Sequence, residues 1–311
     1  MDRWTTSDIP AQNGRSVVVT GTGGLGFQDA LALARAGADV TIAGRNPAKG
    51  AAAVEQIRAA VPNARVQFEK VDLGRLESVA ACAERLRNSR AKLDVLINNA
   101  AVMTPPQRQT TADGFELQFG TNYLGHFALT AQLLPLLQQG DAPRVINLSS
   151  IAARQGSIDF DDLQAERNYQ PMPAYAQSKL ASLLFAFELQ RRSTAAGWGI
   201  TSIAAHPGIS RTDLLTNAPG RQSMSGLARR WLWFLFQPAA QGALPTLYAA
   251  TSPQAAPGAY YGPNMFNETR GHPTLANVPP QARDAAVAAR LWDVSEQLTG
   301  VRFAPAGLVE A

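Results

Sequence analysis

The chain has 311 residues, of which 46% are hydrophobic and 17% are charged, a composition that is ordinary for a globular enzyme and excludes a disordered protein. Its net charge of +4 comes without a lysine- or arginine-rich run, so the sequence gives no support for a nucleic-acid partner. The apolar runs are too short for a transmembrane segment, and residues 1–15 lack the apolar core of a secretory signal, so we expect a cytoplasmic protein.

Cysteine and histidine are scarce. The single cysteine, Cys82, excludes a disulfide framework and a thiolate metal site, and its helical surroundings predict a small core residue. The three histidines lack the spacing of metal ligands, so we expect no metal site. We expect His206 to be structural and His126 to pack or bond locally rather than to catalyse.

Short β-branched runs alternate with longer helical patterns from residue 16 onward. This alternation predicts an α/β fold, a single-domain, Rossmann-type, doubly wound parallel sheet of about seven strands with helices on both faces. The stretch 212–258 breaks the alternation, and we interpret it as a substrate-covering insertion at the carboxyl ends of the strands, where ligands bind in such folds. The predicted strands are 16–20, 39–44, 65–72, 93–100, 144–150, 199–208 and 259–262.

The sequence TGTGGLGF at 20–27 lies between the first predicted strand and a predicted helix. Gly21, Gly23 and Gly26 match the pattern G-x-G-x-x-G in the structural context that gives this pattern meaning. Such a loop lets backbone N–H groups and the start of a helix contact a pyrophosphate. Taken alone, the stretch is also compatible with a glycine turn that binds nothing.

The end of the second predicted strand indicates which nucleotide is bound. A site for NAD usually carries an acidic residue there to accept hydrogen bonds from the ribose 2′-OH. Here the strand ends in IAGRN, and Asp39 is at its other end, too far from the ribose. Arg45 can pair with a 2′-phosphate, which favours NADP, although a solvated surface arginine is the alternative.

The segment 171–192 predicts a helix that begins after Pro173 and carries an apolar stripe. Tyr175 and Lys179 are four residues apart and therefore share one face of this helix. A cation beside a tyrosine favours the phenolate and lowers its pKa from the ordinary value of about 10. The pair is therefore a candidate for acid–base chemistry.

Together these features resemble the short-chain dehydrogenase/reductase family, over residues 14–302. The spacing of 25 positions from Ser150 to Tyr175, with the segments 160–169 and 289–301, resembles the retinol-dehydrogenase-like branch. The features that carry the family resemblance occur in the family's order: the loop 20–26, Asp72-Leu73, NNAA at 98–101, Asn122, Ser150, YAQSK at 175–179 and HPGISRT at 206–212.

The resemblance implies four catalytic residues. Tyr175 would exchange a proton with the substrate oxygen, and Lys179 would lower the tyrosine pKa and hold the nicotinamide ribose. Ser150 would hydrogen-bond the carbonyl, and Asn122 would support a water that links Lys179 to solvent. Taken singly, Asn122 could instead cap a helix and Ser150 could form a turn.

The resemblance also implies an NADP cofactor. Asp72 would bond the adenine, Asn99 and Ala100 would line the adenosine ribose, the segment 207–209 would hold the carboxamide, and Thr212 would lie near the pyrophosphate. The full set of implied cofactor contacts is Gly21, Thr22, Gly23, Gly24, Leu25, Gly26, Arg45, Asp72, Leu73, Asn99, Ala100, Ala101, Tyr175, Lys179, Pro207, Gly208, Ile209 and Thr212.

Two positions depart from the family pattern. Only two residues separate Gly21 from Gly24, so the glycine loop is one residue shorter than the family's T-G-x-x-x-G-x-G. The extra glycine at 23 allows either a tighter turn that reaches the same end or a weaker cofactor site. Ala101 replaces the glycine of the family's N-N-A-G, and its methyl group would crowd the cofactor modestly.

We therefore expect an NADP-dependent enzyme that interconverts a carbonyl and an alcohol on an apolar, fairly bulky small molecule, and that forms a possible homodimer. The aromatic stretch WLWFLF at 231–236 would either cover the substrate or form a core or subunit contact. Two alternatives stay open from the sequence. One is a non-catalytic NADP(H)-binding sensor of the same fold, and the other is a C=C reductase.

Overall fold

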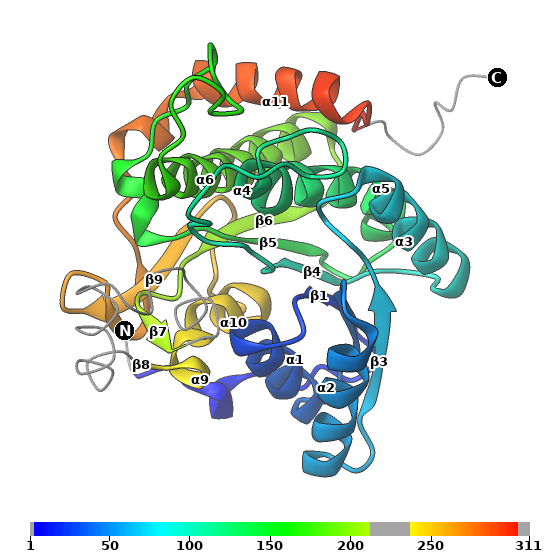
Figure 1. Ribbon diagram of the computed structural model, residues 1–311. Coiled ribbons are helices and arrows are strands. Elements are labelled where there is room, and N and C mark those ends of the chain that lie inside the picture. The colour runs from blue at the N-terminus through cyan, green and yellow to red at the C-terminus, as the bar shows by residue number, and fades with distance from the viewer. Residues whose placement is uncertain (1–2, 212–236, 304–311) are drawn as a thin grey trace.

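An eight-stranded sheet forms the centre of the molecule (Figure 1). The computed structural model describes residues 3–211 and 237–303. The strands lie in the order β10-β9-β6-β5-β4-β1-β2-β3, and all neighbours from β9 to β3 are parallel. The predicted α/β Rossmann-type sheet is confirmed, with strands β1 (Ser16–Thr20), β2 (Asp39–Gly44), β3 (Arg65–Lys70), β4 (Val95–Asn98), β5 (Arg144–Leu148), β6 (Thr201–Ala205) and β9 (Tyr260–Met265).

The eighth strand, β10 (Arg270–Leu275), is missing from the sequence-based prediction. It pairs antiparallel with β9 at the edge of the sheet, and its register shifts between Arg270 and Pro273. Gly271 and Pro273 both weaken the sequence signal of a strand, and an edge strand tolerates proline because only one of its sides pairs. Two further two-residue strands, β7 (Ser210–Arg211) and β8 (Gln237–Pro238), pair with each other outside the main sheet.

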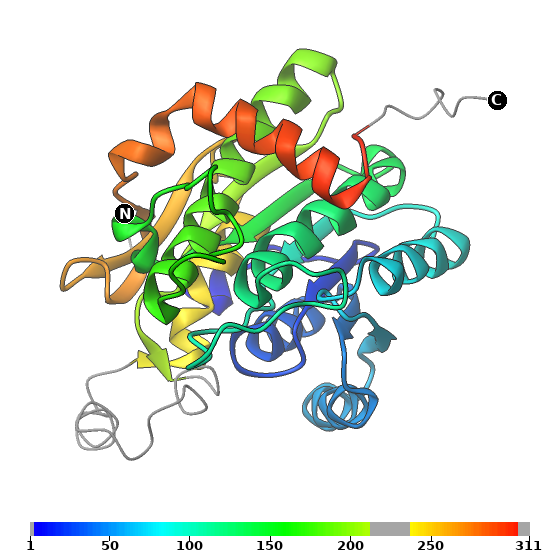
Figure 2. The same cartoon turned by 45° about the horizontal axis from the view of Figure 1, so that its top comes forward.

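Helices cover both faces of the sheet (Figures 1 and 2). Because side chains alternate along a strand, Val18 packs with the helices of one face, whereas Val17 and Val19 pack with those of the other. Cys82 lies fully buried in the first layer, as predicted. One layer contains α3 (Leu76–Ser89), α4 (Leu117–Phe119), α5 (Gly125–Gln138), α6 (Pro171–Ala196) and α11 (Ala285–Thr299), and the other contains α1 (Gly24–Arg35), α2 (Pro47–Ala60) and α10 (Leu244–Thr251).

The long helix α6 begins three residues earlier than the sequence predicts, at Pro171 rather than after Pro173. Both prolines lie in the first turn, where the backbone N–H groups have no partner within the helix. Proline therefore costs no helical hydrogen bond there and does not exclude the helical conformation. The helix ends at Gly197, which adopts a left-handed conformation with φ of +65°.

The stretch 212–258 is described only from residue 237 onward. This part contains α9 (Ala239–Gly242) and α10, and α10 buries Leu247 and Tyr248 against the sheet. The helix α10 thus belongs to one helix layer of the fold, and the substrate-covering role of the insertion stays a prediction. Thr212 and the aromatic stretch 231–236 lie outside the described residues.

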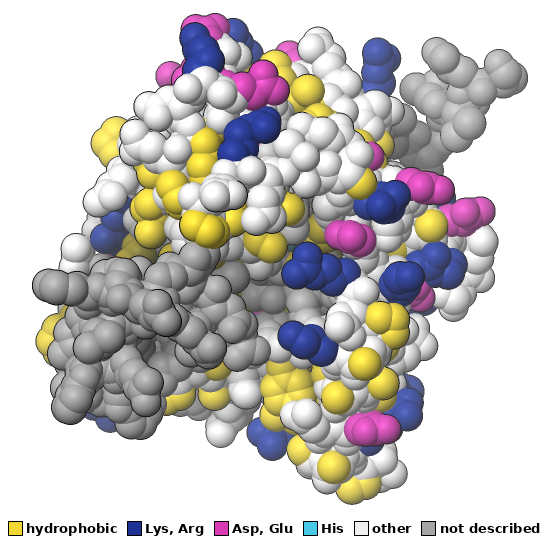
Figure 3. Space-filling view, viewed as in Figure 1, with side chains coloured by type: hydrophobic (Ala, Val, Ile, Leu, Met, Phe, Trp, Pro, Cys, Tyr) yellow, Lys and Arg dark blue, Asp and Glu magenta, His cyan; other side chains and the backbone are white. Residues whose placement is uncertain are grey.

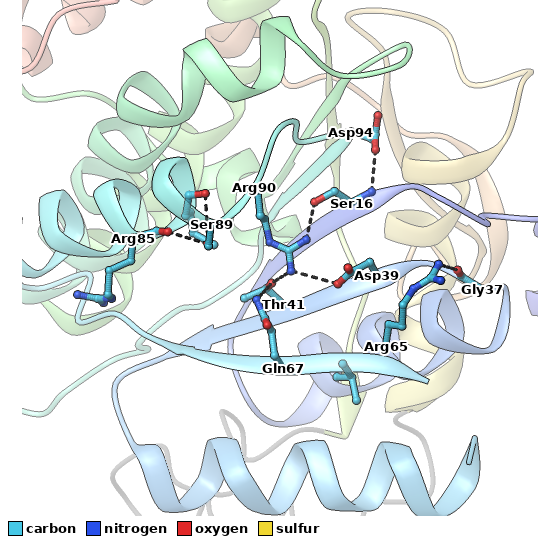
Figure 4. A network of polar contacts seen from close by, with 12 residues as sticks. Ser16, Gly37, Asp39, Thr41, Arg65, Gln67, Arg85, Ser89, Arg90 and Asp94 are labelled. Carbon is cyan, nitrogen blue, oxygen red and sulfur yellow. Dashed lines mark hydrogen bonds and ion pairs between the residues drawn. The ribbon is translucent and has the colours of Figure 1, made fainter. Parts of the chain in front are cut away.

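Arg90, which follows α3, connects the amino-terminal ends of β1 and β2 (Figure 4). Its guanidinium donates hydrogen bonds to Ser16 Oγ at 2.8 Å and to Thr41 Oγ1 at 2.6 Å, and it forms an ion pair with Asp39 at 3.1 Å. This confirms that Asp39 lies at the wrong end of β2 to reach a nucleotide ribose. The arginine side chain is 9% exposed, so the network is a structural tie of β1, β2 and α3.

Among the helices in residues 3–211 and 237–303, none is both long and apolar enough to cross a lipid bilayer. Within the same ranges, no cluster of three or more histidine, cysteine or acidic side chains could hold a metal ion.

Candidate functional site

A cleft of about 740 Å³ opens at the carboxyl ends of β1, β2 and β4. It lies where the strand order reverses between β4 and β1, the usual ligand site of an open α/β sheet. Three segments line it: the loop 21–25, Arg45 together with Lys49 and Gln56 of α2, and residues 99–103 after β4. The face drawn in Figure 3 is hollowed near α1 and α2, and Lys and Arg side chains gather beside the hollow.

The glycine loop forms a tight cradle against Asn99. Gly21 has φ of +104° and donates its N–H to Ala43 O at 2.7 Å. A Cβ at Gly21 would lie 2.7 Å from Asn99 Nδ2, and a Cβ at Gly26 would lie 2.5 Å from Gly21 O. Both positions therefore require glycine because the neighbouring atoms leave no room for a side chain.

The shortened loop still brings the start of α1 to the cleft. Gly23 precedes the helix without a side-chain cap, and Gly24, with φ of +53°, is its first residue. The first N–H groups of α1 are therefore not used by a capping side chain, and residues 21–25 line the cleft. The site fits a pyrophosphate, because free N–H groups and the positive end of the helix dipole stabilise an anion.

Thr20 is a central residue of the site that the sequence analysis missed. Its Oγ1 accepts hydrogen bonds from Asn99 N at 2.9 Å and from Ala100 N at 3.0 Å, and it lies 2.9 Å from His126 Nε2. Its carbonyl accepts a bond from Asn99 Nδ2 at 2.7 Å. The end of β1 thereby fixes the segment after β4 that lines the cleft.

His126 bridges Thr20 and Asn122 inside the fold, as expected for a locally bonded histidine. Asn122 O can only accept a hydrogen bond, so we place the ring proton of the neutral His126 on Nδ1, and Nε2 accepts from Thr20 Oγ1. His126 Nδ1 then donates to Asn122 O at 2.9 Å. Burial lowers the pKa of His126 to about 4, which keeps the ring neutral at physiological pH.

Two cationic side chains lie at the end of the cleft that β2 and α2 form. Arg45 follows β2, and Lys49 lies one turn further on, where its N–H donates to the capping Asn46 Oδ1 at 3.0 Å. The described residues that line the cleft include no aspartate or glutamate. Lys49 was missed in the sequence, although its spacing of four residues from Arg45 could have indicated it.

The four candidate catalytic residues come together from three elements. Tyr175 and Lys179 lie on α6, and Ser150 follows β5 and caps the 3₁₀ helix η3 (Ile151–Gln155), where its Oγ accepts from Ala152 N at 3.2 Å. The Ser150 side chain lies close enough to the Tyr175 hydroxyl to lower its pKa. Asn122 lies in the π-helical turn η2 (Gly120–Leu124).

The side chain of Asn122 hydrogen-bonds two neighbouring segments. The amide bonds both backbone groups of Val102, with Val102 N to Oδ1 at 2.8 Å and Nδ2 to Val102 O at 2.9 Å. Nδ2 also donates to Ser178 Oγ at 3.0 Å, one residue before Lys179. Asn122 therefore connects the cleft-lining segment to the catalytic helix rather than capping a helix.

The protonation of the tyrosine–lysine pair differs from the sequence-based expectation. Burial raises the pKa of Tyr175 to about 12, and the neighbouring Ser150 side chain only partly opposes this rise. Burial also lowers the pKa of Lys179 to about 8. Lys179 Nζ lies over the tyrosine ring, 5.9 Å from its centroid, and donates to Leu148 O at 3.0 Å. The expected lowering of the tyrosine pKa is therefore not found, because burial of the hydroxyl is the largest cause of the shift.

The other predicted cofactor residues occupy the same edge of the sheet. Asn99, Ala100 and Ala101 line the cleft. Asp72 is half-buried, and its Oδ1 accepts from Gly74 N at 3.0 Å, whereas the side chain of Leu73 is buried in the core. The segment Pro207-Gly208-Ile209 follows β6, and Gly208 adopts a φ of +63°.

Comparisons with known proteins show the family to which this chain belongs. The family model described as short chain dehydrogenase matches residues 15–222. Retinol dehydrogenase 13 of Mus musculus is 40% identical over 297 residues, which cover 94% of this chain and 85% of that protein. Polyprenol dehydrogenase of Homo sapiens is 37% identical over 302 residues, covering 94% and 87%. A crystal structure of a Mycobacterium paratuberculosis protein matches with a TM-score of 0.81 at 40% identity, covering 97% of this chain and 100% of that one.

Proposed function

The chain belongs to the retinol-dehydrogenase-like branch of the short-chain dehydrogenase/reductase family, and from this premise we propose that it is an NADP-dependent oxidoreductase that interconverts a carbonyl and an alcohol. One observation carries this proposal. Ser150 lies beside Tyr175, with Lys179 one turn away, at the carboxyl ends of the strands, where the described residues of the cleft include two cations and no carboxylate.

The residues of the cleft fit a dinucleotide. The N–H groups at the start of α1 would hold the pyrophosphate, and Arg45 with Lys49 would pair with the 2′-phosphate. Asn99 to Ala101 would line the ribose, and Asp72 would accept from the adenine. When bound, the nicotinamide supplies or takes up the hydride, and the protein supplies position and electrostatics.

Tyr175 is proposed to act as the proton donor to the substrate oxygen. With its pKa at about 12, its hydroxyl is protonated at neutral pH, which suits the reduction of a carbonyl. Ser150 Oγ would hold the same oxygen and fix its distance from Tyr175. Lys179, largely protonated at neutral pH with a pKa of about 8, would stabilise negative charge that develops beside the tyrosine.

The substrate is proposed to be an apolar, fairly bulky alcohol or its carbonyl counterpart. Two relatives are named for retinol and for polyprenol, both long apolar alcohols. We therefore propose an isoprenoid-type aldehyde or alcohol as the first class to assay.

The Arg45→Gln variant tests the cofactor assignment. The unchanged protein is expected to bind NADPH at least about tenfold more tightly than NADH, because an arginine pairs favourably with a phosphate dianion. Arg45→Gln should weaken NADPH binding by about tenfold and leave NADH binding unchanged, as measured by nicotinamide fluorescence. Lys49→Gln should act in the same direction with a smaller effect.

A matched control is Arg65→Gln, which removes the same charge at the opposite, amino-terminal end of β3 (Figure 4). This variant should bind both cofactors as the unchanged protein does. Tighter binding of NADH than of NADPH by the unchanged protein would show that Arg45 does not read a 2′-phosphate.

A further inference from the structure

The turn between β9 and β10 has an unusual backbone. Phe266, Asn267 and Glu268 follow one another with φ values of 50°, 55° and 65°. Residues other than glycine rarely adopt this left-handed conformation, and a run of three persists only where surrounding contacts enforce it. Thr269 supplies local contacts, since its N–H lies 3.1 Å from Met265 O and its Oγ1 donates to Phe266 O at 2.8 Å.

The run ends in Glu268, whose carboxylate is nearly buried and is held by three groups. Its Oε2 lies 2.9 Å from His206 Nε2 and forms an ion pair with Arg154 at 2.6 Å, and its Oε1 accepts from Asn277 N at 2.9 Å. Burial alone would favour the protonated acid. The bonds from His206 and Asn277, with the charge of Arg154, outweigh it and hold the pKa of Glu268 below its usual value.

His206 transmits this contact to the segment that follows β6. Gly208 N donates to His206 Nδ1 at 3.2 Å, so Nδ1 carries no proton and the ring proton is on Nε2, facing Glu268. The ring is fully buried, and it packs so closely on Gly262 that a Cβ there would overlap it. The ring therefore has one tautomer and one orientation, which Glu268 fixes together with Gly208 N and the packing on Gly262.

The same turn also holds the backbone of residues 207–209 directly. Ile209 N donates to Thr269 O at 2.8 Å, and a Cβ at Gly208 would lie 2.3 Å from that same carbonyl oxygen. On the other side, Gln237 Nε2 donates to Pro207 O at 2.6 Å. The left-handed run of residues 266–268 thus places both Glu268 and Thr269 in contact with the segment after β6.

Arg154 connects this arrangement to the catalytic serine. It lies on η3, the 3₁₀ helix that begins directly after Ser150 and is capped by the serine hydroxyl. Its guanidinium also lies 3.3 Å from Asn267 Oδ1. Glu268 therefore connects two parts of the site. It contacts Arg154 on the 3₁₀ helix that Ser150 caps, and it contacts His206, which precedes the segment 207–209.

We propose that Glu268 is a positioning residue, which fixes the segment Pro207–Ile209 relative to Ser150 through His206 and Arg154 and so preorganises the nicotinamide end of the cofactor site. This inference rests on the proposed function, because it assigns the segment 207–209 to the nicotinamide. The adenosine end, around Arg45, lies on β2 and α2 and shares none of these contacts.

The test compares NADPH with adenosine 2′,5′-bisphosphate, which has the adenosine end but no nicotinamide. In the full-length protein, Glu268→Gln should weaken NADPH binding about three- to thirtyfold, while the affinity for the bisphosphate changes by less than about twofold. Arg154→Met, which leaves the bond between Glu268 and His206 in place, should weaken NADPH binding in the same selective way but less.

Glu188→Gln is the matched control, because Glu188 is also a buried glutamate that pairs with two arginines, Arg191 and Arg192, on α6 away from the cleft. It should leave both affinities unchanged. An equal loss of both ligands in Glu268→Gln, or no loss of NADPH, would overturn the proposal. If the unchanged protein binds the bisphosphate but not NADPH, the positioning role is overturned while the adenosine site stands, and if it binds neither, the proposed function itself has failed.

Discussion

Replacing Tyr175 by phenylalanine is expected to slow NADPH-dependent carbonyl reduction by about a hundredfold to ten-thousandfold, while NADPH binding stays within about twofold. The variant removes only the hydroxyl that we propose as proton donor. The side chain is 6% exposed and packed on α6, so the phenylalanine ring keeps the same packing. The loss should therefore fall on the turnover number and not on cofactor affinity.

Tyr123→Phe is the control for this variant. Tyr123 is also a buried tyrosine, and its hydroxyl bonds Ser295 Oγ at 2.6 Å within the layer of α5, α6 and α11. Its removal should leave the reduction rate unchanged. A Tyr175→Phe protein that retains full activity would remove the tyrosine from the mechanism and favour a non-catalytic, cofactor-binding role.

The raised pKa of Tyr175 also sets the direction of the pH dependence. At neutral pH the hydroxyl is protonated, so the proton needed for carbonyl reduction is present. Alcohol oxidation needs the phenolate, whose fraction rises about tenfold for each pH unit below the pKa. Initial rates in both directions should show oxidation increasing with pH through the neutral range, whereas reduction should not require alkaline pH.

Replacing Asp29 by alanine is expected to raise the free energy of unfolding by about 1–3 kcal/mol at neutral pH. Asp29 lies on α1 with no exposed surface, and neither carboxyl oxygen has a hydrogen-bond partner within the described part of the chain. An unpaired buried carboxyl is unfavourable in either protonation state, and alanine is the better helix former. Urea unfolding, followed by circular dichroism, measures the change.

The effect of Asp29 should depend on pH with a defined sign. Burial raises the pKa of Asp29 well above its ordinary value, so the unfolded chain releases the proton at lower pH than the folded protein does. Stability should therefore fall as the pH rises from about 4 toward the folded-state pKa, and Asp29→Ala should lack this part of the slope. Asp161→Ala, at an exposed position, should leave the slope in place, and a loss of stability in Asp29→Ala would contradict the unpaired carboxyl.

Strands of the sheet such as β1 could be predicted because their burial on both faces leaves an apolar run in the sequence. A parallel strand covered on both faces must be apolar throughout, and the run SVVV satisfies this requirement before any contact is known. β10 could not be predicted, because Pro273 and Gly271 remove the local signal and only the edge position makes them tolerable. The placement of the helices in residues 239–251 could not be predicted either, because it depends on packing against the sheet.

The site residues that come soon after a strand could be predicted, because the carboxyl ends of parallel strands lie together at one side of the sheet. Arg45 directly follows β2, Ser150 lies two residues after the end of β5, and the glycine loop joins β1 to α1. Thr20 and Glu268 could not be found, because their roles depend on partners 79 and 62 residues away in the chain. The direction of the Tyr175 pKa shift was also out of reach, since it depends on how deeply α6 is buried.

The most direct test of hydride transfer to a carbonyl carbon uses NADPH deuterated at the transferable position of the nicotinamide. The purified protein is incubated with this cofactor and an isoprenoid aldehyde such as retinal, and the product is analysed by mass spectrometry and proton NMR. The account predicts an alcohol with one deuterium on the carbinol carbon. Deuterium on a former C=C carbon instead, or NADPH binding without any transfer across a panel of apolar aldehydes and ketones, would contradict it.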